Sequence, residues 1–260
     1  MPSTNLGSAT KKNSSKDESF VLVSSPMSRN LPFLEVQSCA DCPRLRAYCA
    51  QVAEIKRAAH SHDHYWGKPV AGFGDPNAEL VIVGLAPGAH GANRTGRIFT
   101  GDRSGEWLYR ALYEADFANQ PDSHRRDDGL ILKNAYVTCV VKCAPPDNKP
   151  TLDEQNHCRE KYLVKELESL ASAKVYLALG QIALIGLLNA LKSTYRVELS
   201  NLKNLKFGHG KVIELPNGKS IVMSYHPSQQ NTFTKKLTAE MWREIFVTCR
   251  NLCELSQKNS

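Results

Sequence analysis

The sequence lacks a hydrophobic run long enough to cross a bilayer, for which about 20 apolar residues are needed. Its longest apolar stretch, residues 177–191, is interrupted by two glycines, a glutamine and an asparagine. Near the N-terminus, the apolar segment at residues 20–23 is too short for the hydrophobic region of a signal peptide. We also find no internal repeat. We therefore expect a cytoplasmic protein with no membrane partner.

The first 30 residues lack sustained apolar periodicity and are rich in Ser, Lys and Asn. Such a segment buries too little surface to offset the entropy of ordering. We therefore predict a disordered tail over residues 1–30. Hydrophobic residues make up 42% of the whole chain, which is enough for a substantial core, and we predict a single domain over residues 31–260.

Acidic residues are outnumbered, with 26 Asp and Glu against 33 Lys and Arg, so the net charge is +7. A basic surplus suits a polyanionic partner such as a nucleic acid, because lysines and arginines displace counterions from phosphates. The alternative is a solvated basic surface without a specific partner. If the partner is DNA, the protein is associated with the nucleoid.

Short apolar runs alternate with helical patterns along the domain. The runs that predict buried strands are residues 80–85, 135–141, 174–179 and 221–225. The patterns that predict helices are residues 104–115, 151–170, 181–191 and 235–255, the second opening with a capping box. This alternation indicates an α/β fold with a parallel sheet covered on both faces. Ligands bind beyond the carboxyl ends of such strands, so we expect the chemistry there.

Eight cysteines need an explanation in a reducing compartment, where structural disulfides are rare. Two pairs stand out, Cys39 with Cys42 and Cys143 with Cys158. Four thiolates suit a [4Fe–4S] cluster or a structural zinc ion. The alternative is a chance set of thiols in a reduced core, as we expect for the other four cysteines.

Three polar or glycine-rich segments follow or flank the predicted strands. The turn after the first strand, Gly84, Leu85, Ala86, Pro87 and Gly88, is a suitable backbone cradle for a carbonyl or phosphate oxygen.

In the second segment, Phe99 stands between glycines and is a candidate stacking platform for a base, or else a core aromatic. Asp102 in the same segment is a candidate carboxylate, or else a helix cap. His226, after the fourth strand, is placed to donate to a developing oxyanion, or else is a satisfied histidine.

Four segments in this order, GLAPGAHG, GRIFTGDRSG, VVKCAPPDNKPT and HPSQQN, resemble the iron–sulfur uracil-DNA glycosylases, and most closely the type-b branch, also called family 5. The resemblance covers roughly residues 38–246. It implies a three-layer α/β/α sandwich around a central four-stranded, mostly parallel sheet. It also implies a [4Fe–4S] cluster and monofunctional removal of uracil from DNA, which initiates base excision repair.

The resemblance assigns roles to particular residues. Those that look like the cluster ligands are Cys39, Cys42, Cys143 and Cys158. Phe99 looks like the base platform, His226 like the histidine that stabilises charge on the uracil carbonyl, and Asp102 like the catalytic carboxylate of the type-b branch.

Two residues depart from the related type-a enzymes, which have an acid at the position of Leu85 and a uracil-reading asparagine at that of Cys139. These departures predict that the pocket also accepts other deaminated bases. We further expect a monomer that holds DNA phosphates through Arg94, Arg97, Arg103, Ser228 and Asn231. The alternatives are a non-catalytic damaged-DNA-binding module and a zinc-stabilised nucleic-acid-binding domain.

Overall fold

The structure is a computed structural model that describes residues 32–195 and 205–258. The chain separates into two units, Met1–Asn30 and Leu31–Ser260, and everything below concerns the second. The predicted disordered tail, residues 1–30, lies outside the described residues and stays a prediction.

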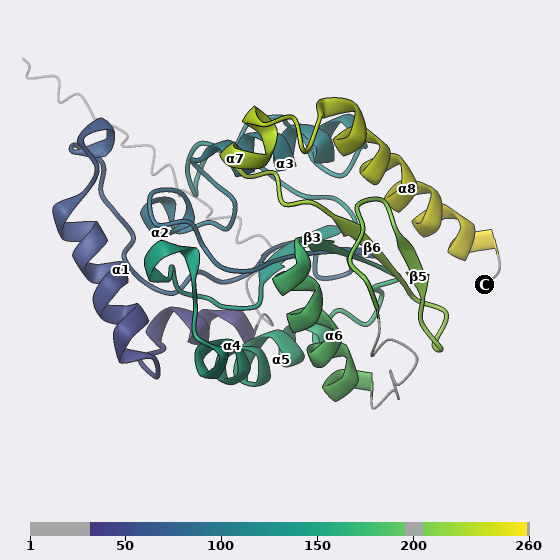
Figure 1. Cartoon of the computed structure of the whole chain (residues 1–260), viewed down its shortest axis with the longest axis horizontal. Coiled ribbons are helices and arrows are strands. Elements are labelled where there is room, and N and C mark those ends of the chain that lie inside the picture. Colours follow the sequence, from purple (N-terminus) through teal and green to yellow (C-terminus); the bar gives the residue numbers. More distant parts are fainter. Residues whose placement is uncertain (1–31, 196–204, 259–260) are drawn as a thin grey trace, which may run out of the picture. The chain divides into compact units, whose positions relative to one another are not determined.

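A six-stranded sheet forms the centre of this unit, in the order β1-β3-β2-β4-β6-β5 (Figure 1). The four inner strands are parallel, and the two edge strands pair antiparallel with their neighbours. The strand bounds are Phe73–Gly74 (β1), Leu80–Gly84 (β2), Ala135–Cys139 (β3), Val175–Leu179 (β4), Val212–Glu214 (β5) and Ser220–Ser224 (β6). The inner strands are the four predicted ones.

Alternate residues of the inner strands pack into two separate cores because successive side chains point to opposite faces of a sheet. On β2, Val81 and Val83 belong to one core, while Leu80 and Ile82 belong to the other. All of β2, β3 and β4 is buried, which explains why these strands appear in the sequence as continuous apolar runs.

Helices cover both faces of the sheet and complete the three-layer α/β/α arrangement (Figure 1). One face is covered by α1 (Pro43–Ile55), α4 (Leu152–Cys158), α5 (Val164–Ser169) and α6 (Gln181–Tyr195), and the other by α2 (Ala92–Thr95), α3 (Arg103–Glu114) and α8 (Ala239–Lys258). The remaining short elements are η2 (Pro32–Ser38), η3 (Ala58–His60), η4 (Pro146–Asn148), the π-helical turn η5 (Arg159–Leu163) and α7 (Gln229–Phe233).

The predicted helices are confirmed with adjusted bounds. The capping box at Thr151 is present, since its side chain accepts a hydrogen bond from the Glu154 N–H. The helical stretch that follows runs through α4, η5 and α5 to Ser169. The last helix begins at Ala239, later than the predicted residue 235, where Lys235 has a left-handed φ of 57°. Among the described helices, none is both long and apolar enough to cross a membrane.

Candidate active site

The order of the strands places a crevice at the carboxyl end of the sheet. From β2 the chain moves to β3 on one side and then returns to β4 on the other, so the connections after β2 and β4 leave in opposite directions. In open α/β sheets, ligands bind at such a switch point.

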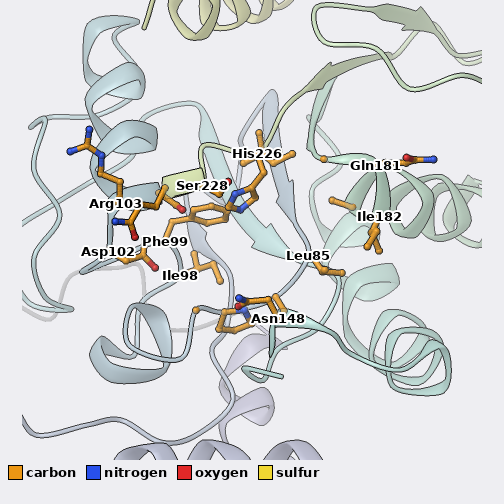
Figure 2. A pocket seen from close by; sticks show the side chains of 18 residues that line it. Leu85, Ile98, Phe99, Asp102, Arg103, Asn148, Gln181, Ile182, His226 and Ser228 are labelled. Carbon is orange, nitrogen blue, oxygen red and sulfur yellow. The ribbon is translucent and has the colours of Figure 1, made fainter. Parts of the chain in front are cut away.

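A cavity of about 660 Å³ lies at this point (Figure 2). Its walls come from the segments after β2, β3, β4 and β6 and from the loop that leads into α3. The side chains and turns that line it are Leu85, Ala86, Pro87, Gly88, Ile98, Phe99, Asp102, Arg103, Ser104, Asn148, Leu179, Gly180, Gln181, Ile182, Ala183, His226, Ser228 and Gln229. The structure therefore brings both predicted catalytic residues and most of the predicted binding residues to one cavity.

Phe99 both lines the cavity and packs in the core. Its side chain is only 7% exposed, and its φ of 50° lies in the left-handed region that non-glycine residues rarely adopt. A Cβ at Gly84 would lie 2.8 Å from the Phe99 ring, so the glycine that ends β2 allows the ring to approach the strand. The two alternatives for Phe99 are thus compatible.

Cys139 reaches the same glycine from β3, where a Cβ on Gly84 would lie 3.0 Å from its sulfur. The thiol is 1% exposed and is not part of the cavity lining. Burial raises the pKa of Cys139 to about 12, so the side chain is a neutral thiol. Gly84 and Cys139 therefore shape the wall behind the Phe99 ring, and the structure does not place Cys139 at the cavity surface.

His226 lies against Phe99, with ring centroids 5.7 Å apart and planes inclined by 30° (Figure 2). Burial lowers the pKa of His226 to about 4, because a charged imidazole is disfavoured away from water. The neutral ring keeps one N–H that it can donate. Asn231 holds this loop in place, since its side-chain N–H₂ donates to the His226 carbonyl at 2.8 Å.

Ser228 lines the cavity and also caps α7, where its hydroxyl accepts from the Asn231 N–H. Asn231 itself does not line the cavity. Its observed contacts support the His226 loop, and the expectation that it holds a phosphate stays a prediction.

The two carboxylate oxygens of Asp102 have different contacts. Oδ1 accepts from the Gly105 N–H at 3.0 Å and caps α3, as the alternative reading of the sequence had it. Oδ2 lies against the turn after β2, where a Cβ on Gly88 would come within 2.8 Å and one on Gly91 would collide with it. Burial raises the pKa of the Asp102 carboxyl, and hydrogen bonds from the Gly105 and Ser104 N–H groups oppose that rise.

Two of the arginines expected to hold phosphates are instead structural. Arg97 is 3% exposed and forms a buried pair with Asp128 at 2.7 Å. Arg94 donates to Asp63, to the His90 carbonyl and to the Gly101 carbonyl. Their guanidinium groups stiffen the loop around Phe99, because buried charges require partners. Arg103, by contrast, lines the cavity.

Asn148 is a cavity residue that the sequence reasoning missed. It ends η4, after β3, and adopts a φ of 57° directly after Asp147 with a φ of 52°. Two successive left-handed residues turn the loop over the cavity (Figure 2). The signal in the sequence was Asp-Asn after two prolines, since Asp and Asn tolerate this conformation best among non-glycine residues.

The four paired cysteines line a second, small cavity between α1, α4 and the loop after β3. Cys143 and Cys158 are each 7% exposed, and the Lys142 N–H donates to the Cys158 sulfur at 3.3 Å. Four thiols from three separate segments of the chain thus converge, which favours a bound group over a chance set. Within residues 32–195 and 205–258, no three His, Cys, Asp or Glu side chains form a group that could hold a metal ion.

Comparisons with known proteins agree with this geometry. Residues 71–247 match the family model described as the uracil DNA glycosylase superfamily. The chain is 45% identical over 221 residues to a type-5 uracil-DNA glycosylase of Thermus thermophilus, covering 84% of this chain and 95% of the relative. It is 42% identical to a type-5 uracil-DNA glycosylase of Mycobacterium bovis, covering 84% and 79%. It is 31% identical to a type-4 uracil-DNA glycosylase of Thermotoga maritima, covering 61% and 69%.

Proposed function

Because the chain belongs to the uracil-DNA glycosylase superfamily, we propose that it hydrolyses the N-glycosidic bond of uracil, and of other deaminated bases, in DNA. In this role it acts as a monomer in the cytoplasm, at the nucleoid. The observation that carries the proposal is that Asp102 and the neutral His226 line the same cavity at the carboxyl end of the sheet.

Breaking this bond places positive charge on the sugar and negative charge on the leaving base. Only groups that bind those charges more strongly in the transition state accelerate the reaction. His226, held neutral by burial, donates its N–H to the oxygen of the base as negative charge develops there. Its role needs no proton transfer, since a neutral donor already stabilises the anion.

Asp102 serves the opposite charge. When ionised, its Oδ2 stabilises the oxocarbenium-like sugar and orients a water molecule for attack on the anomeric carbon. The α3 cap fixes the other oxygen, so the carboxylate is positioned before the substrate arrives. Phe99, on the cavity wall beside His226, provides the aromatic surface for the flipped base.

The cysteine cavity fits a [4Fe–4S] cluster, whose ligands would be Cys39, Cys42, Cys143 and Cys158. Four thiolates suit either a [4Fe–4S] cluster or a zinc ion, and the resemblance to the iron–sulfur uracil-DNA glycosylases favours the cluster. When bound, the cluster supplies four iron–thiolate bonds that tie the segment before α1 to the loop after β3 and to the end of α4.

A single-turnover assay tests the proposed activity. Excess protein is mixed with an end-labelled duplex that contains one G·U pair, and abasic sites are revealed by alkaline cleavage. We expect cleavage at the uracil and none in the matched G·C duplex. Tight binding to the G·U duplex without cleavage would instead establish a damaged-DNA-binding module.

A further inference from the structure

Exposed lysines surround an aromatic cluster next to the candidate active site, and the chemistry described above uses none of them. We call this region the lysine–aromatic surface; its members are Lys206, Phe207, His209, Lys211, Tyr225, Lys235 and Lys236. All four lysines are exposed, whereas the aromatic rings are partly buried among themselves.

The sheet topology brings these separated segments together. Strand β5 runs antiparallel to β6, so the segment that precedes β5 lies at the carboxyl end of β6 (Figure 1). The pairing continues beyond the strand, since the Met223 N–H donates to the Lys211 carbonyl at 2.9 Å and the Gly210 N–H donates to the Met223 carbonyl at 2.9 Å. This end of β6 leads directly into Tyr225 and His226.

Ring contacts fix the surface to the active-site loop. The His209 ring stacks on Tyr225 with centroids 5.1 Å apart and planes inclined by 18°, and its Nδ1 accepts from the Tyr225 N–H at 3.2 Å. The ring centroid of Phe207 lies 5.9 Å from that of Tyr225. Lys236, which follows α7, places its Nζ 4.9 Å from the Tyr225 ring centroid. The Lys236 side chain and the Lys211 backbone are therefore held at a defined position relative to His226.

The ammonium groups of this surface lack ion-pair partners among the described residues. Within the described part of the chain, none of the four lysines forms an ion pair; the carboxylate of Glu244, on α8, interacts with His209 instead. Arg103, which lines the cavity, lies 5.7 Å from the exposed ring of Phe233 in α7, two residues before Lys235. Positive charge thus continues from the cavity rim across α7 to the edge of the sheet.

We propose that the lysine–aromatic surface binds the sugar–phosphate backbone of the DNA strand that leads away from the target nucleotide. The proposal rests on the proposed function, which places the target nucleotide in the adjacent cavity. A phosphate backbone is the partner that a group of exposed ammonium ions without carboxylate partners fits best, because each contact releases condensed counterions. Held phosphates offset the cost of a few kcal/mol for extruding the base.

The test compares two triple variants with the same charge change. The first is Lys206→Gln/Lys235→Gln/Lys236→Gln on the surface. The second is Lys133→Gln/Lys165→Gln/Lys192→Gln, a control at exposed lysines before β3, on α5 and near the end of α6, which form no ion pair among the described residues. The dissociation constant for an undamaged duplex is measured across a series of salt concentrations, and single-turnover cleavage of a G·U duplex is measured at saturating enzyme.

Each lost phosphate contact lowers the salt slope of the logarithm of the binding constant by about 0.9. We expect the surface variant to lose about 2–3 in slope, and the control variant to keep both the wild-type slope and the wild-type rate of cleavage at saturating enzyme. A surface variant with the wild-type slope, or a control variant that loses as much, overturns the proposal. Failure of the wild-type protein to cleave uracil would refute the proposed function, while the slopes would still test the surface.

Discussion

Asp102 combines a structural and a chemical task in one carboxylate, and a single substitution separates them. Asp102→Asn keeps the oxygen that caps α3 and removes the charge that faces the cavity. We expect single-turnover cleavage of a G·U duplex to fall by a factor on the order of 10²–10³, equivalent to about 3–4 kcal/mol. The melting temperature and the affinity for DNA should change little. A variant that cuts at the wild-type rate would leave Asp102 as a helix cap alone.

His226 makes the stability of the fold depend on pH. Its pKa is lowered by burial from 6.5 to about 4, so between these values the unfolded chain binds a proton at His226 that the folded chain does not. The contribution to stability is therefore complete above pH 6.5 and is lost as the pH falls toward 4. The loss is at most about 3 kcal/mol.

Urea unfolding of the wild type and of His226→Gln, at neutral pH and at about pH 4.5, measures this contribution. Burial also lowers the pKa of His90 and of His209, so the difference between the two proteins isolates His226. We expect the variant to lose less stability on acidification than the wild type. Equal losses in the two proteins would contradict a His226 that is neutral in the folded chain because of its lowered pKa.

At the scale of elements, the four cysteines of the small cavity come from segments outside the strands of the sheet. Cys39 and Cys42 precede α1, and Cys158 ends α4. We expect replacement of any one proposed ligand by Ala to bleach the absorption near 400 nm and to lower the melting temperature. Cys253→Ala is the matched control, because this buried thiol on α8 belongs to the opposite core and should leave the colour intact. Ligand variants that keep the full absorption would contradict the assignment.

A buried ion pair ties β3 to the helical layer beside that cavity. Lys142 and Glu166 are 2% and 1% exposed and lie 2.7 Å apart, and Lys142 also donates to Thr138 at 2.6 Å. Lys142→Met leaves the carboxylate buried without its partner, and we expect a loss of about 3–5 kcal/mol in the free energy of unfolding.

The double variant Lys142→Met/Glu166→Gln should recover most of that loss, because it removes both charges. Lys174→Met, which breaks a more exposed pair with Glu79, should cost about 1 kcal/mol or less. Urea unfolding of these three variants and of Glu166→Gln gives the comparison. Simple additivity of the two substitutions at Lys142 and Glu166 would mean that the pair is not coupled.

At the scale of the whole molecule, the cavity assembles its walls from the ends of four strands, and those walls are largely apolar. The aliphatic side chains Leu85, Ile98, Leu179 and Ile182 line it, while Cys139 lies outside the lining. An apolar wall discriminates mainly by size, whereas a buried polar reader left unpaired rejects wrong ligands strongly. We therefore expect hypoxanthine and xanthine to be released as well as uracil. Activity confined to uracil under excess enzyme, in parallel single-turnover assays, would contradict this.

The sequence by itself determined the inner strands, the capping box and the order of the polar segments. These features depend on local chemistry. Short, β-branched runs such as residues 80–84 are typical of a strand buried on both faces, and the Thr151 cap needs only the three residues that follow it. The resemblance to the iron–sulfur uracil-DNA glycosylases followed from the same local segments. The parallel arrangement then predicted that those segments meet at one end of the sheet.

Only the tertiary structure decided which side chains reach the cavity. The edge strands β1 and β5 are two and three residues long and exist because neighbouring strands pair with them, so no periodicity revealed them. In the sequence, Arg97 and Arg103 are equivalent candidates for phosphate binding. In the structure, Arg97 is buried in an ion pair with Asp128, which is distant in the chain, whereas Arg103 lines the cavity. Burial and partners are set by contacts between distant residues, and these contacts appear only when the chain is folded.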